Sequence, residues 1–142
     1  MKRSPSRTVK LDIASRLEML ETVQTVLLHL SGIVGFDEEA THYMSVAVRE
    51  SVVNAIKHGN AGDEGKRVAI SFILDAGRLE VSVRDEGRGF DPASVPNPTA
   101  VENLLKADGR GIFFMRSFMD DVSYAFPTGG GTVVTMVKRK KG

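Results

Sequence analysis

The sequence predicts a single domain of the α+β class, a two-layer sandwich with helices on one face of a mostly antiparallel sheet. The 142 residues fit one domain and leave little room for a second. Helical periodicity dominates between about residues 15 and 58, and strand alternation dominates over 67–85. Two more strands near the C-terminus complete the order β-α-α-β-β-loop-α-β-β, which is typical of this architecture.

A strand and a helix are predicted at the N-terminal end. Residues 7–13 alternate as a short strand does. The pattern Ser15-x-x-Glu18 is typical of a capping box and predicts that a helix opens there. Apolar residues then recur at helical spacing from Leu17 onward, and Gly32 predicts the end of this helix.

A second helix is predicted from Asp37 to about His58. Asp37 is a favourable N-cap, and Glu38 and Glu39 lie in the first turn, where the helix dipole favours negative charge. Gly59 suits the left-handed position that follows the last helical residue. The helix is apolar nearly all round, which indicates that it is buried.

The second half of the chain predicts strands around a long loop. Residues 67–85 alternate on both sides of a glycine turn and predict a β-hairpin. Residues 86–109 are rich in Gly, Pro, Asp and Asn, and a loop this long in a compact domain is often functional. A third helix is predicted after Gly111, and strands are predicted over 122–126 and 132–138, joined by a triple-glycine turn.

Composition excludes several classes of function. The net charge is +1, from 19 basic and 18 acidic residues, and gives no reason to expect nucleic-acid binding. The absence of cysteine excludes disulfides, thiolate metal sites and cysteine nucleophiles, and it is compatible with a reducing cytosol. No apolar run approaches the roughly 20 residues of a membrane span, and the basic start lacks the apolar segment of a secretory signal. We therefore expect a cytoplasmic domain over 7–138, between basic tails at 1–6 and 139–142.

The second predicted helix carries polar groups along one face. Glu50, Asn54 and Lys57 follow one another at steps of three and four, so Glu50 and Asn54 point the same way. Because a buried carboxylate without a partner is costly, one interpretation is a structural hydrogen bond or ion pair. The other is that Asn54 supplies an oxygen ligand to Mg²⁺ while Glu50 acts through a water or as a base. The residues alone leave both interpretations open.

A glycine-containing segment directly follows the predicted hairpin. In Asp85-Glu86-Gly87-Arg88-Gly89-Phe90, the Asp85 carboxylate would lie at a strand end, where it could accept a hydrogen bond from a base amino group. Gly87 and Gly89 would let the backbone come close to a ligand. A plain glycine turn is the alternative interpretation of this segment taken alone.

A second glycine-containing segment precedes the third predicted helix. Gly109 and Gly111 enter a helix N-terminus, whose exposed N–H groups and dipole attract phosphate. Arg110, between them, could contact a phosphate directly. The pattern is neither a Walker A loop nor a Rossmann fingerprint, and an ordinary helix start is the alternative.

Taken together, these segments resemble the motifs of the GHKL ATPase family. Glu50-x-x-x-Asn54-Ala55-x-x-His58-Gly59 resembles the N-box, Asp85-x-Gly87-x-Gly89-Phe90 the G1 box, and Gly109-Arg110-Gly111 the G2 box. Three motifs in this order are far more specific than any one of them. Within the family, the N-box with its flanking Arg49 and Asn60, and the phrase Phe118-Met119-Asp120-Asp121-Val122, are similar to bacterial anti-sigma factors that are serine-protein kinases. The resemblance covers about residues 7–138.

The resemblance implies the Bergerat fold, with a mixed but mostly antiparallel sheet, and implies ATP and Mg²⁺ as ligands. Asn54 would coordinate Mg²⁺, Asp85 would bind the adenine amino group, and Thr132 could assist at the adenine. Glu50 would be the general base toward a serine or threonine hydroxyl of a protein. The remaining implied site residues would shape the pocket or meet the phosphates: Gly87, Gly89, Gly109, Gly111, Arg110 and Lys57. Residues 90–108 would form a lid over ATP.

The resemblance also implies partners. These are a sigma factor and a small antagonist that carries the target serine or threonine, exchanged by partner switching. A homodimer formed with the help of the first helix is a further expectation. Two other functions stay open: a nucleotide-gated binding regulator without transfer, in which Glu50 is structural, and the ATPase piece of a histidine kinase. Against the last, His29, His42 and His58 are more typical of core, surface or N-box positions than of phosphoacceptors.

Overall fold

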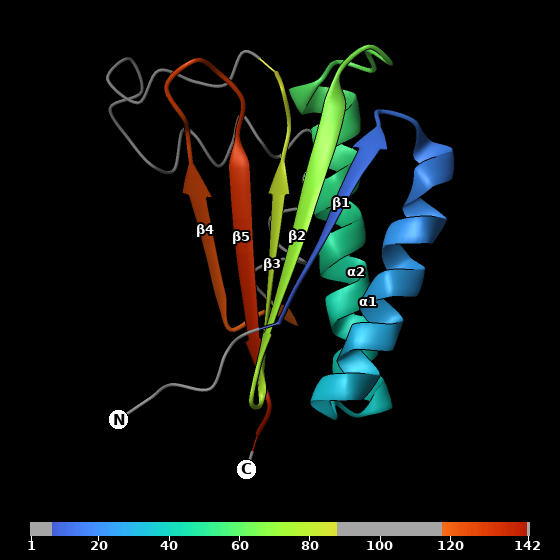
Figure 1. Cartoon of the computed structure of the whole chain (residues 1–142), viewed down its shortest axis with the longest axis vertical. Coiled ribbons are helices and arrows are strands. Elements are labelled where there is room, and N and C mark those ends of the chain that lie inside the picture. Colours follow the sequence, from blue (N-terminus) through green and yellow to red (C-terminus); the bar gives the residue numbers. More distant parts are fainter. Residues whose placement is uncertain (1–6, 88–117, 142) are drawn as a thin grey trace.

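The computed structural model describes residues 7–87 and 118–141, and these residues form a two-layer sandwich (Figure 1). The five strands are β1 (Arg7–Ala14), β2 (Arg67–Asp75), β3 (Arg78–Arg84), β4 (Asp121–Ala125) and β5 (Val133–Arg139). The helical elements are a 3₁₀ turn η1 (Leu17–Met19), α1 (Leu20–Val34), α2 (Glu38–Asn54) and a π-helical turn η2 (Ala55–Gly59).

The sheet has the strand order β1-β2-β3-β5-β4, and both helices lie on one of its faces (Figure 1). Each of the four neighbouring strand pairs is antiparallel, so no parallel pair occurs among the described strands. The predicted helix-on-sheet sandwich and the hairpin over 67–85 are therefore confirmed. Both C-terminal strands are also confirmed, and each begins within one residue of the predicted start. The helix predicted after Gly111 lies outside the described residues.

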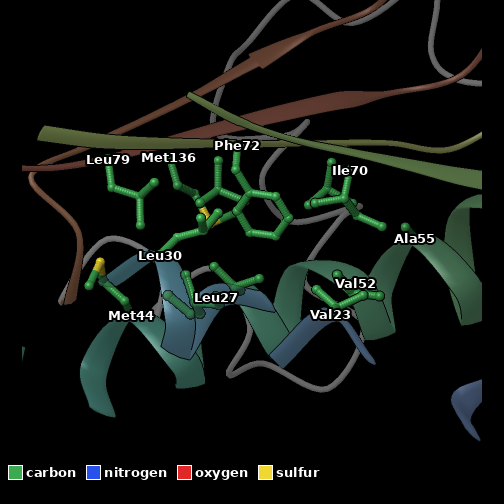
Figure 2. Close-up of a cluster of buried hydrophobic side chains, with 14 of the residues drawn as sticks. Val23, Leu27, Leu30, Met44, Val52, Ala55, Ile70, Phe72, Leu79 and Met136 are labelled. Atoms are coloured by element: carbon green, nitrogen blue, oxygen red, sulfur yellow. The ribbon is translucent and has the colours of Figure 1, made fainter. Parts of the chain in front are cut away.

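The core lies between the sheet and the two helices (Figure 2). Alternation along each strand directs every second side chain toward the helices, and in β2 these alternate residues are all buried. Phe72 of β2 and Leu27 of α1 are both 0% exposed and belong to this layer (Figure 2). The other labelled core side chains are Val23, Leu30, Met44, Val52, Ala55, Ile70, Leu79 and Met136. Burial of these side chains is the main force that holds helices and sheet together.

The first helix differs from the prediction at both ends. Arg16 precedes η1 and makes no side-chain cap bond, so the predicted capping box at Ser15 is wrong. Ser15 is instead buried, and its hydroxyl donates to the Lys66 carbonyl oxygen at 2.7 Å, a partner far away in the sequence. The helix also continues through Gly32 and ends at Val34, where Gly35 takes a left-handed φ of 95°.

The second helix begins as predicted and ends differently. Asp37 caps α2, because its Oδ1 accepts a hydrogen bond from the Ala40 N–H at 2.8 Å. At the other end, the chain continues from Asn54 into the π-helical turn η2, a distortion that often marks functional sites. Gly59 belongs to this turn and is not among the residues with positive φ, so its predicted left-handed role is wrong.

The segment Leu17–Val34, which covers η1 and α1, is strongly apolar. It is the one helical stretch among the described residues with the length and composition of a membrane span, with a mean hydropathy of 1.2 over 18 residues. A single such helix is weak evidence, because the core helix of a soluble protein and a signal sequence pass the same test, and 22% of this stretch is buried. Here Val23, Leu27 and Leu30 are buried in the core, which accounts for the apolar face that packs on the sheet.

Candidate functional site

The described site residues gather at one end of the sheet, where β3 stops and β5 begins. Asp85 directly follows β3, and Thr132 directly precedes β5. The Asp85 N–H donates to the Thr132 carbonyl oxygen at 3.1 Å, which extends the β3–β5 ladder by one residue on each side. Both residues are buried, at 6% and 4% exposure. Asp85 therefore lies at the end of a strand, as predicted.

The Asp85 carboxylate is held by backbone donors on one of its two oxygens. Oδ1 accepts hydrogen bonds from the Gly87 N–H at 2.9 Å and from the Thr132 N–H at 3.2 Å. Among the described residues, the hydrogen bonds to this carboxylate are made to Oδ1 and none is made to Oδ2. Burial raises the pKa of the Asp85 carboxyl above its ordinary value, and the hydrogen bonds from Gly87 and Thr132 oppose that rise. The arrangement is a buried, oriented acceptor, as a binding site for a polar N–H group requires.

Three glycines allow the backbone to close around Asp85. A Cβ at Gly59 would collide with the Asp85 carboxylate and lie 2.9 Å from the Asp85 Cβ. A Cβ at Gly87 would collide with the Gly59 carbonyl oxygen, and one at Gly131 with the Asp85 carbonyl oxygen. Gly131 also has a φ of 89°. The end of η2, the turn after β3 and the start of β5 thus meet at distances that side chains would prevent.

This close packing explains why glycine is needed at positions 59 and 131, which the sequence patterns did not indicate. We expected Gly59 to end a helix and the triple glycine before Thr132 to make a turn. The turn is confirmed, because the Gly130 N–H donates to the Pro127 carbonyl oxygen at 3.1 Å, and Gly131 and Gly59 also provide space for Asp85, which is distant in the sequence. The N-box pattern included Gly59, but it did not indicate that Gly59 would pack against Asp85. Gly87 packs against Gly59, whereas its predicted close approach to a ligand stays a prediction.

The polar face of α2 lies at the same end of the molecule. The Glu50 side chain is 16% exposed, and its ion-pair partner is Arg49, whose Nη1 lies 3.7 Å from Glu50 Oε1. Asn54 is half-buried one turn later, and Lys57 is exposed. We expected this helix to be buried on all sides, and that expectation is wrong, because the sheet covers one side of it only. Its fully buried side consists of Met44, Ala47, Val48, Ser51 and Val52.

Asn60 is the functional candidate that sequence reasoning missed. It lies one residue beyond η2 and is 0% exposed. Its side chain makes three hydrogen bonds, with Ser15, Arg67 and Glu86, and thus joins three segments next to Asp85. In the sequence, Asn60 served only as a flanking residue in the resemblance of the N-box and was given no role in the site.

Several predicted site residues lie outside the described residues. These are Gly89, Gly109, Arg110 and Gly111, together with the lid predicted over 90–108. Their assignment stays a prediction. Of the described ones, Asp85, Gly87 and Thr132 are in direct contact, whereas Glu50, Asn54 and Lys57 come from the α2–η2 segment beside them.

Comparison with known proteins agrees with this geometry. Residues 13–138 match the family described as histidine kinase-like ATPase domain. The serine-protein kinase RsbW of Listeria monocytogenes serovar 1/2a is 30% identical over 133 residues, which cover 85% of this chain and 83% of that protein. RsbW of Bacillus subtilis strain 168 is also 30% identical, over 131 residues and 81% of its length.

A solved structure supports the fold. The RsbU and RsbW domains of a Mycobacterium tuberculosis protein match 96% of this chain with a TM-score of 0.67 and 21% identity, and the chain spans 33% of that larger protein. The resemblance to GHKL ATPases and to serine-protein kinases is thereby confirmed. The chain belongs to the histidine kinase-like ATPase domain family, among the relatives of the serine-protein kinase RsbW.

Proposed function

We propose that this protein binds Mg-ATP and transfers the terminal phosphate to a serine or threonine of a small partner protein. The observation that carries the proposal is the buried Asp85 carboxylate, which packs against Gly59 and whose Oδ2 accepts no hydrogen bond from the residues that the structure describes. Similarity to proteins named serine-protein kinases supports the transfer step. The proposal therefore combines a specific acceptor geometry with a family assignment.

In this proposal Asp85 accepts a hydrogen bond from the adenine amino group through Oδ2. Its Oδ1 is already occupied by the Gly87 and Thr132 amides, so the carboxylate cannot rotate without losing both bonds. Thr132 would assist at the base, and Gly87 would line the pocket. The residues proposed at the phosphates or around the rest of the nucleotide are Lys57, Gly89, Gly109, Arg110 and Gly111.

Asn54 is proposed to hold Mg²⁺ through its side-chain oxygen. It is half-buried on α2, one turn from Glu50, and an amide oxygen is a ligand type that Mg²⁺ accepts. A Mg²⁺ ion held by one protein side chain takes its other ligands from phosphate and water, as is usual for this ion. When bound, it would offset the charge on the phosphates.

Glu50 is proposed as the general base. Its side chain retains 16% exposure, and the 3.7 Å separation from Arg49 is long for a hydrogen-bonded ion pair, so the carboxylate can turn to a substrate. It would accept the proton of the serine or threonine hydroxyl while the hydroxyl oxygen bonds to the γ-phosphorus. The bond from that phosphorus to ADP breaks in the same step, and ADP leaves with the bridging oxygen.

The proposed cellular role is that of a cytoplasmic anti-sigma factor. The protein would sequester a sigma factor and exchange it for the unphosphorylated antagonist. Phosphorylation adds about −1.5 to −2 charges to the antagonist, which would favour its release from the acidic catalytic site. The first helix leaves Leu28 and Ile33 about half exposed, at 53% and 46%, and this supports its use in protein contacts such as a homodimer.

The experiment that tests the proposal is a capture from the source lysate, with and without Mg-ATP, read by mass spectrometry. A sigma factor together with a small partner that gains phosphoserine or phosphothreonine would support the proposal. Glu50→Gln should abolish the transfer while ATP affinity is retained, and Glu21→Gln on α1 is the matched control. Nucleotide-dependent partners without a new phosphosite would favour the regulator without kinase activity. Acid-labile phosphohistidine would favour the histidine-kinase alternative.

A further inference from the structure

We infer that Asn60 is a positioning residue for nucleotide binding, because it fixes the backbone segment that presents Asp85. This inference rests on the proposed function and adds a residue to which neither motif nor comparison assigns a role. It follows from the hydrogen bonds of one fully buried amide side chain.

The Asn60 side chain uses both of its ends. Its Oδ1 accepts a hydrogen bond from the Glu86 N–H at 2.7 Å. Its Nδ2 donates to the Ser15 Oγ at 2.8 Å and to the Arg67 carbonyl oxygen at 3.0 Å. Among the common side chains, only an amide offers an acceptor and two donors in one planar group. Aspartate at this position would lose the donors, and alanine would lose all three hydrogen bonds.

The Glu86 N–H is the amide that immediately follows Asp85, so its direction sets the turn after β3. Three successive amides of this turn are each fixed by a different partner. Asp85 N–H donates to Thr132, Glu86 N–H to Asn60, and Gly87 N–H to the Asp85 carboxylate. Without the Asn60 acceptor, the Glu86 N–H loses its hydrogen-bond partner. The turn that follows Asp85 is then less well fixed, and so is the orientation of the Asp85 carboxylate.

The neighbouring contacts anchor Asn60 itself. Its backbone N–H donates to the Ala55 carbonyl oxygen at 2.8 Å, which places it at the end of η2. The Ser15 hydroxyl that Asn60 contacts also donates to the Lys66 carbonyl oxygen, and the Arg67 N–H donates to Glu86 Oε2 at 2.7 Å. Asn60 thus connects the end of β1, the start of β2 and the α2–η2 segment to the turn that carries Asp85. The Ser15 side of this network stabilises the fold, and the Glu86 side orients the site.

These two sides can be separated by mutation. Asn60→Ala removes the acceptor for Glu86, whereas Ser15→Ala removes contacts of the same network but leaves that acceptor in place. Hydrogen exchange of the Glu86 amide reports the orientation of the turn without any nucleotide. ATP titration, carried out well below the unfolding temperature of each variant, reports the site. A purely structural role for Asn60 would lower the unfolding temperature and leave ATP affinity unchanged.

We expect Asn60→Ala to increase exchange at Glu86 and to raise the Kd for ATP by about tenfold or more. Ser15→Ala should lower the unfolding temperature while the Kd stays within about twofold of the wild-type value. An Asn60→Ala protein with unchanged Kd, or a Ser15→Ala protein with the same increase in Kd, would overturn the inference.

If Asn60→Ala does not fold, Asn60→Asp and Asn60→Ser can replace it in both measurements. In any folded variant at residue 60, protection of the Glu86 amide and ATP affinity must change together, and a change in one alone would refute the coupling. If wild-type protein fails to bind ATP, the proposed function fails. Exchange at Glu86 in the variants would still show whether Asn60 orders the turn.

Discussion

The close packing of Gly59 against Asp85 gives the sharpest prediction about the site. Substitution Gly59→Ala adds one methyl group at a helix end, a change that is usually mild or favourable for helical residues. Here the methyl group would overlap the Asp85 carboxylate and lie 2.9 Å from its Cβ. The neighbour is a short, hydrogen-bonded side chain at 6% exposure, so it has little room to move away.

The expected magnitude follows from the two ways in which this overlap can be relieved. Shifting the backbone is a form of overpacking, which typically costs about 1–3 kcal/mol. Rotating the Asp85 side chain would instead break its hydrogen bonds with the Gly87 and Thr132 amides, and an unsatisfied buried amide costs about 1–3 kcal/mol. Because the less costly of the two routes sets the effect, we expect Gly59→Ala to lower the free energy of unfolding by about 1–3 kcal/mol and to weaken ATP binding by at least about tenfold.

Urea unfolding followed by circular dichroism measures the first effect, and calorimetric titration with ATP measures the second. Gly32→Ala is the matched control, because Gly32 lies within α1 and a Cβ there meets nothing within 4 Å. It should raise the unfolding free energy by about 0.5–1 kcal/mol and leave ATP binding unchanged. If Gly59→Ala is as stable as the wild type and binds ATP normally, the packing argument for this site is incorrect.

Three further predictions address the carboxylate, the cation and the core. Burial raises the folded-state pKa of Asp85, so its contribution to stability is present at acidic pH and is lost as pH rises from about 3.9 through the folded pKa. Asp85→Asn should remove that pH dependence in urea unfolding and should weaken ATP more than GTP; an unchanged ATP-to-GTP preference would count against the adenine assignment. Asn54→Ala should raise the Mg²⁺ concentration needed for half-maximal phosphoryl transfer, while Mg²⁺-free nucleotide binding changes little, and equal loss of both would contradict the assignment. Leu27→Ala should cost about 2–5 kcal/mol in the same unfolding assay, because the side chain is 0% exposed; a cost under about 1 kcal/mol would show that the core collapses around it.

The main elements of this protein could be read from local periodicity. Strand alternation and the capping residue Asp37 depend on neighbours within a few positions, and both were predicted correctly. The position of Asp85 at a strand end followed from the same alternation. Where a residue had competing partners, local reasoning failed: the Ser15 hydroxyl contacts Lys66 and Asn60 rather than the start of the helix.

What the sequence by itself determined was therefore the described strands and the two long helices, their order, and the polar residues that distinguish this chain from an ordinary α+β domain. The tertiary structure alone decided that Gly59 and Gly131 close on Asp85, and that Asn60 joins Ser15 to Glu86 across 45 and 26 positions of the chain. The physical reason is that periodicity records which face of an element is buried but not which distant backbone it meets. Those long-range contacts are determined by the packing of the helices on the sheet, and the proposed nucleotide site consists of them.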